Sequence, residues 1–331
     1  MPPSPESNDR SLIQQAADKH AEEILARRQE SRTRRAAALA AHPQPLSIKT
    51  ELTRVPLAAA APAPVSTTTQ TAGYLLAVGD SWFDYPIHDI LTRLDDNYGY
   101  NIESSAHRGD PIEAMVSPVG QLDKFARCMD KIVALGAAPK AILISGGGDD
   151  IAGKEFGMLI DNIDLQPVPG WNDQVLTGVI DTRIAAAYRL MFLSINSLCQ
   201  KNLHATFPIL VHGYDYPVPD GRGFLGGGWL FPGPWLKPGF DEKLFTDINV
   251  TTQMMVTVID RFNTMLENLV KEPGFENVTY IDLRNTLSNS QANYQDWWAN
   301  EIHPTAGGLF GGQDGWGAVA AKFQAVLATL P

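Results

Sequence analysis

Short apolar runs that end in turn residues constrain the fold of this chain more than any other feature. Examples are Tyr74–Val78, Ala141–Ser145 and Phe207–His212. Runs of this length and composition are typical of strands that are buried on both faces. They alternate with longer segments of helical periodicity, such as Ile112–Leu135 and Phe245–Val270. This alternation predicts βαβ units and a parallel sheet with helices on both faces.

The remaining elements follow the same rhythm. Strands are expected at Tyr98–Ser104 and Val278–Leu283, and helices at His88–Leu94, Thr182–Cys199 and Trp316–Leu327. A chain of 331 residues is long enough to bury a large core around such a sheet. We therefore expect an α/β domain over residues 72–331.

The first 71 residues have a different composition. Residues 9–41 are charged and helical in pattern, with a thin apolar stripe. Residues 42–71 are rich in Ala, Pro and Thr, which is typical of a linker. The helix either docks a partner or mediates oligomerisation, or it is a solvated extension. The low apolar content favours the extension slightly.

Bulk properties exclude some classes of function. The net charge of −11 argues against non-specific nucleic-acid binding, which needs a basic surface. The sequence contains no run of about 18 apolar residues, so no integral membrane segment is predicted. The N-terminus lacks a secretory signal pattern. A cytoplasmic location is the default, and signal-independent secretion stays open. The two cysteines, Cys128 and Cys199, are expected to be buried free thiols.

The stretch from Leu75 to Pro86 contains the first candidate for chemistry. An apolar strand ends in Gly79-Asp80-Ser81-Trp82, where Gly79 permits a tight bend. A serine just past such a strand lies where an open α/β sheet places its site. The alternative is an ordinary strand-to-helix turn in which Ser81 or Asp80 caps the helix.

Three further strand ends favour the catalytic interpretation. Gly109 follows the second strand, Asp149 follows the third, and His303 lies between the last strand and the last helix. The carboxyl ends of parallel strands meet at one edge of the sheet. A hydroxyl nucleophile, a histidine base and hydrogen-bond donors for an oxyanion are the groups that acyl transfer requires.

These motifs resemble the four sequence blocks of the GDSL or SGNH hydrolases. The resembling segments are Gly79-Asp80-Ser81-Trp82, Gly109, Gly147-x-Asp149-Asp150 and the block that ends in His303-Pro304. The resemblance covers about residues 72–331. It implies a flavodoxin-like, three-layer α/β/α fold and a serine ester hydrolase of the esterase or lipase type. By position, Ser81 would be the nucleophile, His303 the general base, and Ser81 and Gly109 would donate main-chain hydrogen bonds to the oxyanion.

Two positions depart from the family pattern. Asp149 stands where the family has the oxyanion-hole Asn, and an ionised carboxylate cannot donate a hydrogen bond. Burial near other acids would protonate it and restore a donor. Asn300 stands where the family has the Asp that orients the histidine. Either another acid (Asp149, Asp296 or Glu301) takes over as the partner of His303, or the site is weakened or repurposed.

A long loop and several aromatic residues are candidates for substrate binding. Residues 214–240 combine many Gly and Pro residues with aromatic side chains. The aromatic residues argue against disorder and favour an ordered lid or an apolar substrate wall, and a packed surface loop is the alternative. An apolar lid suits an acyl chain or an aromatic ester. The expected substrate-binding residues are Trp82, His107, His212, Trp229 and Trp235. For His212, a structural role in the core is an equal alternative.

The sequence contains no pattern that calls for a cofactor or a metal. The glycines before Asp149 lack the Lys-Ser/Thr of a phosphate-binding loop, and adjacent carboxylates alone make a weak metal site. The predicted function is ester hydrolysis through an acyl-enzyme on Ser81, on a small-molecule or lipid ester. The alternatives are a catalytically weakened protein that binds an acyl or glycan ligand, and a scaffold that docks through its N-terminal helix.

Overall fold

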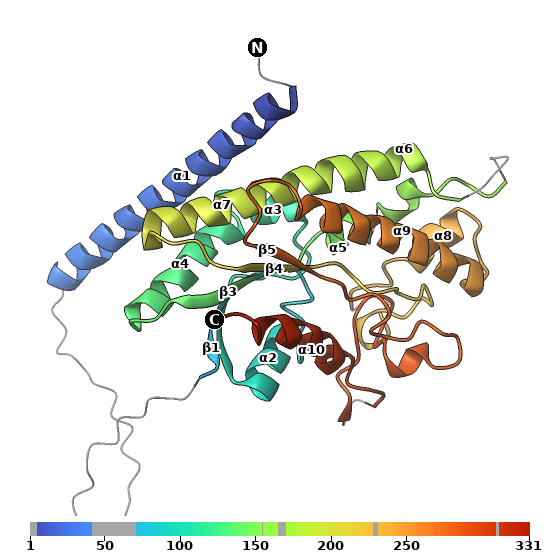
Figure 1. Ribbon diagram of the computed structural model, residues 1–331. Helices are drawn as coiled ribbons and strands as arrows, with labels where there is room; N and C mark the ends of the chain where they lie inside the picture. The colour runs from blue at the N-terminus through green and yellow to red at the C-terminus, as the bar shows by residue number, and fades with distance from the viewer. Residues whose placement is uncertain (1–4, 42–70, 154, 165–169, 228–230, 309–310) are drawn as a thin grey trace, which may run out of the picture.

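The computed structural model describes residues 5–41, 71–153, 155–164, 170–227, 231–308 and 311–331 (Figure 1). Its centre is a five-stranded sheet in the order β2-β1-β3-β4-β5, with every neighbouring pair parallel. The strands are β1 (Gly73–Val78), β2 (Tyr100–Ser104), β3 (Pro139–Ile144), β4 (Ile209–His212) and β5 (Val278–Ile281). This is the strand order of flavodoxin-like folds, and it confirms the predicted parallel α/β architecture.

Apolar side chains from adjacent strands form the middle of the core. Leu76 of β1 is in register with Ile142 of β3, which is in register with Ile209 of β4. All three side chains are buried. Burial on both faces explains why these strands are continuous apolar runs without alternation.

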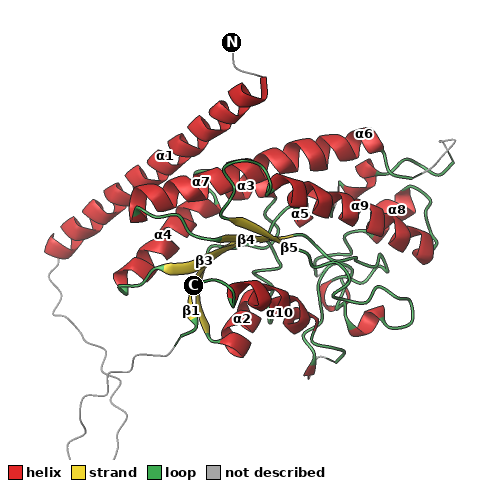
Figure 2. Ribbon diagram, in the orientation of Figure 1, coloured by secondary structure: helices red, strands yellow, loops and turns green. Residues whose placement is uncertain are grey.

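Helices cover both faces of the sheet (Figure 2). Helices α2 (Ile90–Tyr98) and α10 (Gly315–Leu327) pack together on one face. The other face carries α3 (Ile112–Val116), α4 (Gln121–Ala134), α7 (Ala185–Leu203) and α9 (Ile248–Leu269). The short helices are α5 (Gly148–Ile151), α6 (Asp173–Leu176) and α8 (Lys237–Glu242). Within the described ranges, none of the helices combines the length and apolar character that a membrane span requires.

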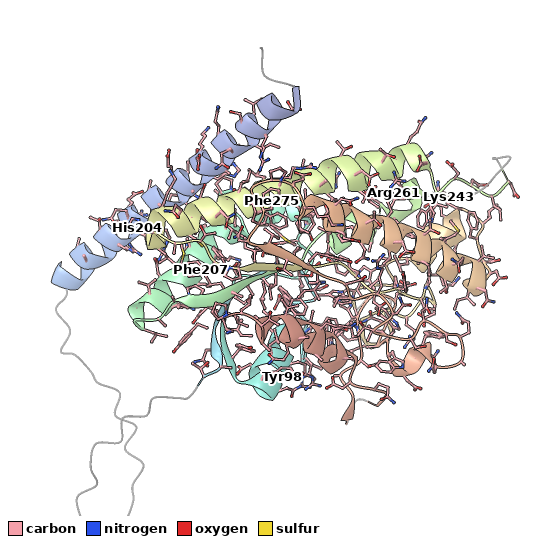
Figure 3. The ribbon with its side chains drawn as sticks, viewed as in Figure 1. Tyr98, His204, Phe207, Lys243, Arg261 and Phe275 are labelled. Carbon is pink, nitrogen blue, oxygen red and sulfur yellow. The ribbon has the colours of Figure 1, made fainter. Side chains whose placement is uncertain are left out.

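Two predicted helices differ from the observed ones. The segment expected as one helix over Ile112–Leu135 is divided into α3 and α4, because Pro118 and Gly120 interrupt it. The helix expected from Thr182 begins earlier, since α6 continues through a π-helical segment, Thr177–Ile184, into α7. Arg261 of α9, which is labelled in Figure 3, forms ion pairs with Asp173 of α6 (2.5 Å) and with Asp181 of the π-helical segment (2.6 Å).

The N-terminal helix α1 (Pro5–Ala41) packs along α7 of the same chain (Figure 1). Ala17, Ala21 and Ile24 are fully buried in this contact, and the small side chains of the two alanines allow the helices to approach closely. The favoured prediction of a solvated extension is therefore wrong. The apolar stripe is thin because two of its three fully buried residues are alanines, and only Ile24 is large.

Polar contacts fix α1 along its length. The hydroxyl of Ser197 donates to Asp18 at 2.5 Å, and Lys201 pairs with Glu22 at 2.8 Å. Arg28 and Arg32 both pair with Asp130 of α4. The basic second half of the helix therefore binds an acidic position of its own domain. The predicted linker, residues 42–71, lies outside the described residues except for Thr71.

Both cysteines are buried and free, as predicted. Cys128 lies on α4 and Cys199 on α7. Burial raises the pKa of the Cys199 thiol to about 12, which makes it an inert core residue.

Candidate active site

The candidate site lies at the carboxyl edge of the sheet, between β1 and β3. Strand β2 flanks β1 on one side and β3 flanks it on the other, so the order of the strands reverses here. In open α/β sheets a crevice forms at this switch point. Ser81, which follows β1, and Asp149, which follows β3, line the same cavity.

Ser81 lies in a turn and not at the start of a helix. Helix α2 begins at Ile90, and its cap is Asp89, whose carboxylate accepts a hydrogen bond from the Thr92 N–H at 2.7 Å. The alternative in which Ser81 or Asp80 caps the next helix is therefore wrong. The side chain of Ser81 is free for another role.

Gly79 is required by close packing rather than by a left-handed bend. Its φ angle lies outside the left-handed region, but a Cβ atom there would lie 2.8 Å from the Phe83 ring and 2.9 Å from the Ser145 side chain. Any larger residue would displace β1 from the end of β3. The glycine thus keeps the turn that carries Ser81 close to the sheet.

The Asp80 carboxylate anchors that turn. It accepts hydrogen bonds from the Trp82 N–H (2.9 Å), from the Ser145 hydroxyl (2.5 Å) and from the Tyr214 hydroxyl. Asp80 is almost completely buried. It joins the ends of three strands, which makes its role structural. Within the described part of the chain, no group of three or more His, Cys, Asp or Glu residues is arranged to hold a metal ion.

Three side chains form a continuous hydrogen-bonded chain at the site. The Nε2 atom of His303 lies 2.7 Å from the Oγ atom of Ser81, and its Nδ1 atom lies 3.1 Å from the Oδ1 atom of Asn300. This is the geometry of a nucleophile, its base and the group that orients the base. The structure thus brings Ser81, His303 and Asn300 together from sequence positions more than 200 apart.

The neighbours of Asn300 set the tautomer of His303. The Asn300 Oδ1 atom accepts the main-chain N–H groups of Ile302 (3.1 Å) and His303 (3.0 Å), and its Nδ2 atom donates to the Tyr85 hydroxyl (2.9 Å). The amide oxygen therefore faces His303, so Nδ1 carries the ring hydrogen. Nε2 is left as the acceptor for the Ser81 hydroxyl.

His303 is enclosed by aromatic side chains. Its ring centroid lies 4.3 Å from that of Tyr85 and 5.4 Å from that of Trp235. Burial lowers the pKa of His303 to about 3. The imidazole is consequently neutral and ready to accept a proton at physiological pH, but its protonated form is poorly stabilised, because no carboxylate faces Nδ1.

The acids considered as replacement partners of His303 lie elsewhere. The carboxylate of Glu301 points to the lid segment, Asp296 is exposed, and Asp149 lies on the cavity side of Ser81. The hypothesis that another acid takes over from Asn300 is therefore wrong. Asn300 itself orients the histidine, through an uncharged amide.

Asp149 is a partly buried acid with one unused, buried oxygen. Its Oδ2 atom is buried and has no hydrogen-bond partner among the described residues, while its carboxyl group faces the Gly109 N–H. Burial, followed by the negative charges of Asp80, Asp150 and Asp110, raises the pKa of Asp149 to about 8. The carboxyl is therefore mostly protonated at neutral pH and carries an O–H donor.

Glu301 ties the lid to the loop that carries His303. Its carboxylate accepts hydrogen bonds from four main-chain N–H groups of the lid segment, those of Gly221 (3.0 Å), Trp235 (2.5 Å), Leu236 (2.8 Å) and Lys237 (2.9 Å). The Glu301 N–H in turn donates to the carbonyl of Arg222 at 3.1 Å. The lid is therefore an ordered part of the site around these residues.

The other predicted substrate-binding residues occupy different environments. Trp82 lines the cavity, and Trp235 packs against His303. His212 is fully buried beneath Trp82, with its Nδ1 atom 2.6 Å from the Gly213 carbonyl oxygen, and it does not line the cavity. His107 is exposed and pairs with Asp110. Trp229 lies outside the described residues.

Sequence reasoning missed Tyr85 and Tyr214 and did not give Glu301 its role as a lid anchor. Tyr85 packs against the His303 ring and accepts a hydrogen bond from Asn300, while the Tyr214 hydroxyl donates to Asp80. Tyr85 stands only four residues after Ser81, and Tyr214 directly follows a strand end. The sequence therefore shows where the two tyrosines stand, but not which side chains they contact.

Comparisons with known proteins identify no family for this chain. No family model and no curated protein matches this sequence. Solved structures to which this chain is similar include a catalytic mutant of Axe2, an acetylxylan esterase from Geobacillus stearothermophilus (12% identity, TM-score 0.39, covering 78% of this chain and 94% of that one).

Two others have similar scores. One is LAE5, an α/β hydrolase enzyme from the metagenome of Lake Arreo (12% identity, TM-score 0.38, covering 79% of this chain and 97% of that one). The other is a Streptococcus pneumonia protein described as a platelet activating factor (15% identity, TM-score 0.41, covering 79% and 86%). At this level of similarity they indicate no activity for this chain.

Proposed function

We propose that this protein is a serine hydrolase that cleaves carboxylic esters through an acyl-enzyme on Ser81. The observation that carries the proposal is the 2.7 Å contact between the Ser81 hydroxyl and Nε2 of a His303 ring whose other nitrogen is bound by Asn300. A serine is a weak nucleophile until a positioned base removes its proton. That requirement is met by this arrangement.

The reaction follows from the positions of the protons. Ser81 Oγ attacks the ester carbonyl carbon while its proton passes to Nε2 of His303. The resulting tetrahedral oxyanion collapses, the ester C–O bond breaks, and the alcohol leaves with the proton from Nε2. Water then attacks the acyl-enzyme, His303 takes a proton from it, and the carboxylic acid is released as Ser81 regains its hydrogen.

Hydrogen-bond donors beside Ser81 stabilise the oxyanion in this scheme. The candidates are the main-chain N–H group of Ser81, the Gly109 N–H, which faces the Asp149 carboxyl, and the protonated carboxyl of Asp149 itself. The unused buried oxygen of Asp149 and its raised pKa of about 8, caused by burial and then by neighbouring carboxylates, support the third donor. Each such donor is worth about 10²–10³ in rate in other serine hydrolases.

A second candidate function is a catalytically weakened protein that binds an acyl or glycan ligand. The neutral side chain of Asn300 favours it, because an amide stabilises the imidazolium less than a carboxylate does. Burial lowers the pKa of His303 to about 3, which also favours the weakened site, because the protonated imidazole is then poorly stabilised. The scaffold alternative receives less support, since α1 already packs against α7 of its own chain.

Covalent labelling tests the proposal. The wild-type protein, Ser81→Ala, His303→Ala and the control Ser104→Ala are treated with a fluorophosphonate probe and assayed with p-nitrophenyl acetate. Ser104 is exposed and lies on the neighbouring strand β2. We expect labelling and hydrolysis in the wild type and the control, and neither in Ser81→Ala. Labelling that persists without Ser81, or a wild type with neither property, would reject the hydrolase and leave the binding protein.

A further inference from the structure

The cavity beside Ser81 is small. Its volume is about 50 Å³. An apolar protein cavity of about 150 Å³ holds a single benzene molecule. The cavity therefore has room for about one or two carbon atoms next to the carbonyl carbon of a bound ester.

The shape of the site assigns this cavity to the acyl side of the ester. The leaving alcohol has to face Nε2 of His303, from which it takes its proton. His303 does not line the cavity, whereas Ser81 and Asp149 do. The substituent that enters the cavity is thus the acyl group. This assignment rests on the proposed function.

Closely packed side chains form the apolar wall. Met255 and Ile259 come from α9, and Leu236 comes from the lid; all three are at least nine-tenths buried. The Leu236 main chain is held by Glu301 at 2.8 Å. Making room for one more methylene group in a closely packed interior costs free energy, because neighbouring side chains have to move.

The carboxylate of Asp215 in the cavity lining already has its full set of hydrogen-bond partners. The Asp215 carboxylate accepts main-chain N–H groups from Tyr216, Asn285, Thr286 and Leu287 at 2.6–2.9 Å. The Asp215 carboxylate is therefore not available to bind a polar group of the substrate. The space is thus suited to a small apolar substituent.

We infer that the site accepts esters of short acyl groups, acetyl and propionyl, and excludes medium and long chains, with Met255 and Ile259 as the residues that set the limit. A lipid or other long-chain acyl substrate, which the aromatic lid suggested from the sequence, does not fit a cavity of this size.

The chain-length profile of the full-length wild type is the direct test. The values of kcat/KM are measured for p-nitrophenyl acetate, propionate, butyrate, hexanoate and octanoate. One methylene too many in a closed apolar pocket costs about tenfold or more. We expect kcat/KM to fall by at least about tenfold between propionate and hexanoate. A flat profile, or a preference for octanoate, would overturn the inference.

Three variants identify the wall. Met255→Ala enlarges the cavity and should raise the hexanoate-to-acetate ratio of kcat/KM by about tenfold. Ala152→Val, at another lining position, should lower the ratio of propionate to acetate. Met254→Ala is the matched control, because Met254 is the adjacent methionine of α9 and does not line this cavity. An equal shift in Met254→Ala and Met255→Ala would reject the assignment of the wall.

The labelling experiment separates this inference from the proposed function. If the fluorophosphonate labels Ser81 and the chain-length profile is flat, the hydrolase stands and the short-acyl inference fails. If Ser81 is not labelled and no ester is hydrolysed, both fail. If Met255→Ala does not fold, the wild-type profile and Ala152→Val still decide the question.

Discussion

The side-chain oxygen of Asn300 lies 3.1 Å from Nδ1 of His303, where serine hydrolases with a Ser-His-Asp triad have a carboxylate. The amide supplies the orienting hydrogen bond without the negative charge. The Tyr85 hydroxyl, 2.9 Å from Nδ2 of Asn300, holds the amide in that orientation. Orientation and charge, which one aspartate usually provides together, are therefore separated in this site.

Replacing Asn300 by aspartate should increase activity. Both carboxylate oxygens would have partners, because the Tyr85 hydroxyl can donate where it now accepts. The new charge raises the pKa of His303 and stabilises the imidazolium. Replacing the triad aspartate by asparagine in a serine protease lowers kcat by about 10⁴-fold. We therefore expect Asn300→Asp to raise kcat for p-nitrophenyl acetate by about 10- to 10³-fold. Asn300→Ala, which removes the orienting oxygen, should lower it. An Asn300→Asp variant slower than the wild type would contradict this account.

The pH profile should have an alkaline limit set by Asp149. His303 acts as a base only when neutral, so activity is lost as the pH falls through its burial-lowered pKa of about 3. Asp149 donates only when protonated, so activity is lost as the pH rises through about 8, the pKa that burial and the charges of Asp80, Asp150 and Asp110 give it. The profile of kcat/KM, corrected for spontaneous hydrolysis, reports both limits for the free enzyme.

Variants of Asp149 assign the alkaline limit. An amide donates at every pH, so Asp149→Asn should keep activity above pH 8 and remove the alkaline decline. Asp149→Ala removes the donor and should lower kcat by about 10²–10³ at all pH values. An alkaline limb that is unchanged in Asp149→Asn would show that another group titrates there.

Glu301→Gln should loosen the lid. The buried carboxylate accepts four main-chain N–H groups, and an amide has only one acceptor oxygen. We expect a loss of about 2–3 kcal/mol in the free energy of unfolding, measured by urea denaturation. Hydrogen exchange at residues 221 and 235–237 should increase. Asp296→Asn is the matched control, because Asp296 is a nearby exposed acid, and it should change neither quantity.

A charge at the contact between α1 and α7 should release the N-terminal helix. Ala21 is fully buried there, so Ala21→Asp places a carboxylate in an apolar contact at a cost of about 2–4 kcal/mol. Limited proteolysis should then cleave α1 faster than in the wild type. Ala36→Asp, on an exposed part of the same helix, should leave the digestion pattern unchanged. Equal cleavage of both variants would argue that α1 is not held by this contact.

Local patterns in the sequence are enough to predict the sheet and the edge at which the candidate site lies. Runs such as Leu75–Val78 and Ala141–Ile144 are apolar throughout because both faces of a parallel strand are covered, and this pattern is local in the sequence. Once the strands are known to be parallel, the residues after each strand must share one edge. Ser81 and His303 could therefore be expected close together without any knowledge of their contacts.

The tertiary structure decided which atoms meet at that edge. Loop side chains such as Tyr85, Asn300 and Glu301 take their positions from partners that are distant in sequence, and no local period records such partners. Likewise, the buried alanines of α1 can be identified as a helix-packing surface only because α7 is seen to lie against them. The protonation of Asp149 and the neutrality of His303 depend on burial, which is a property of the packed chain and not of either residue.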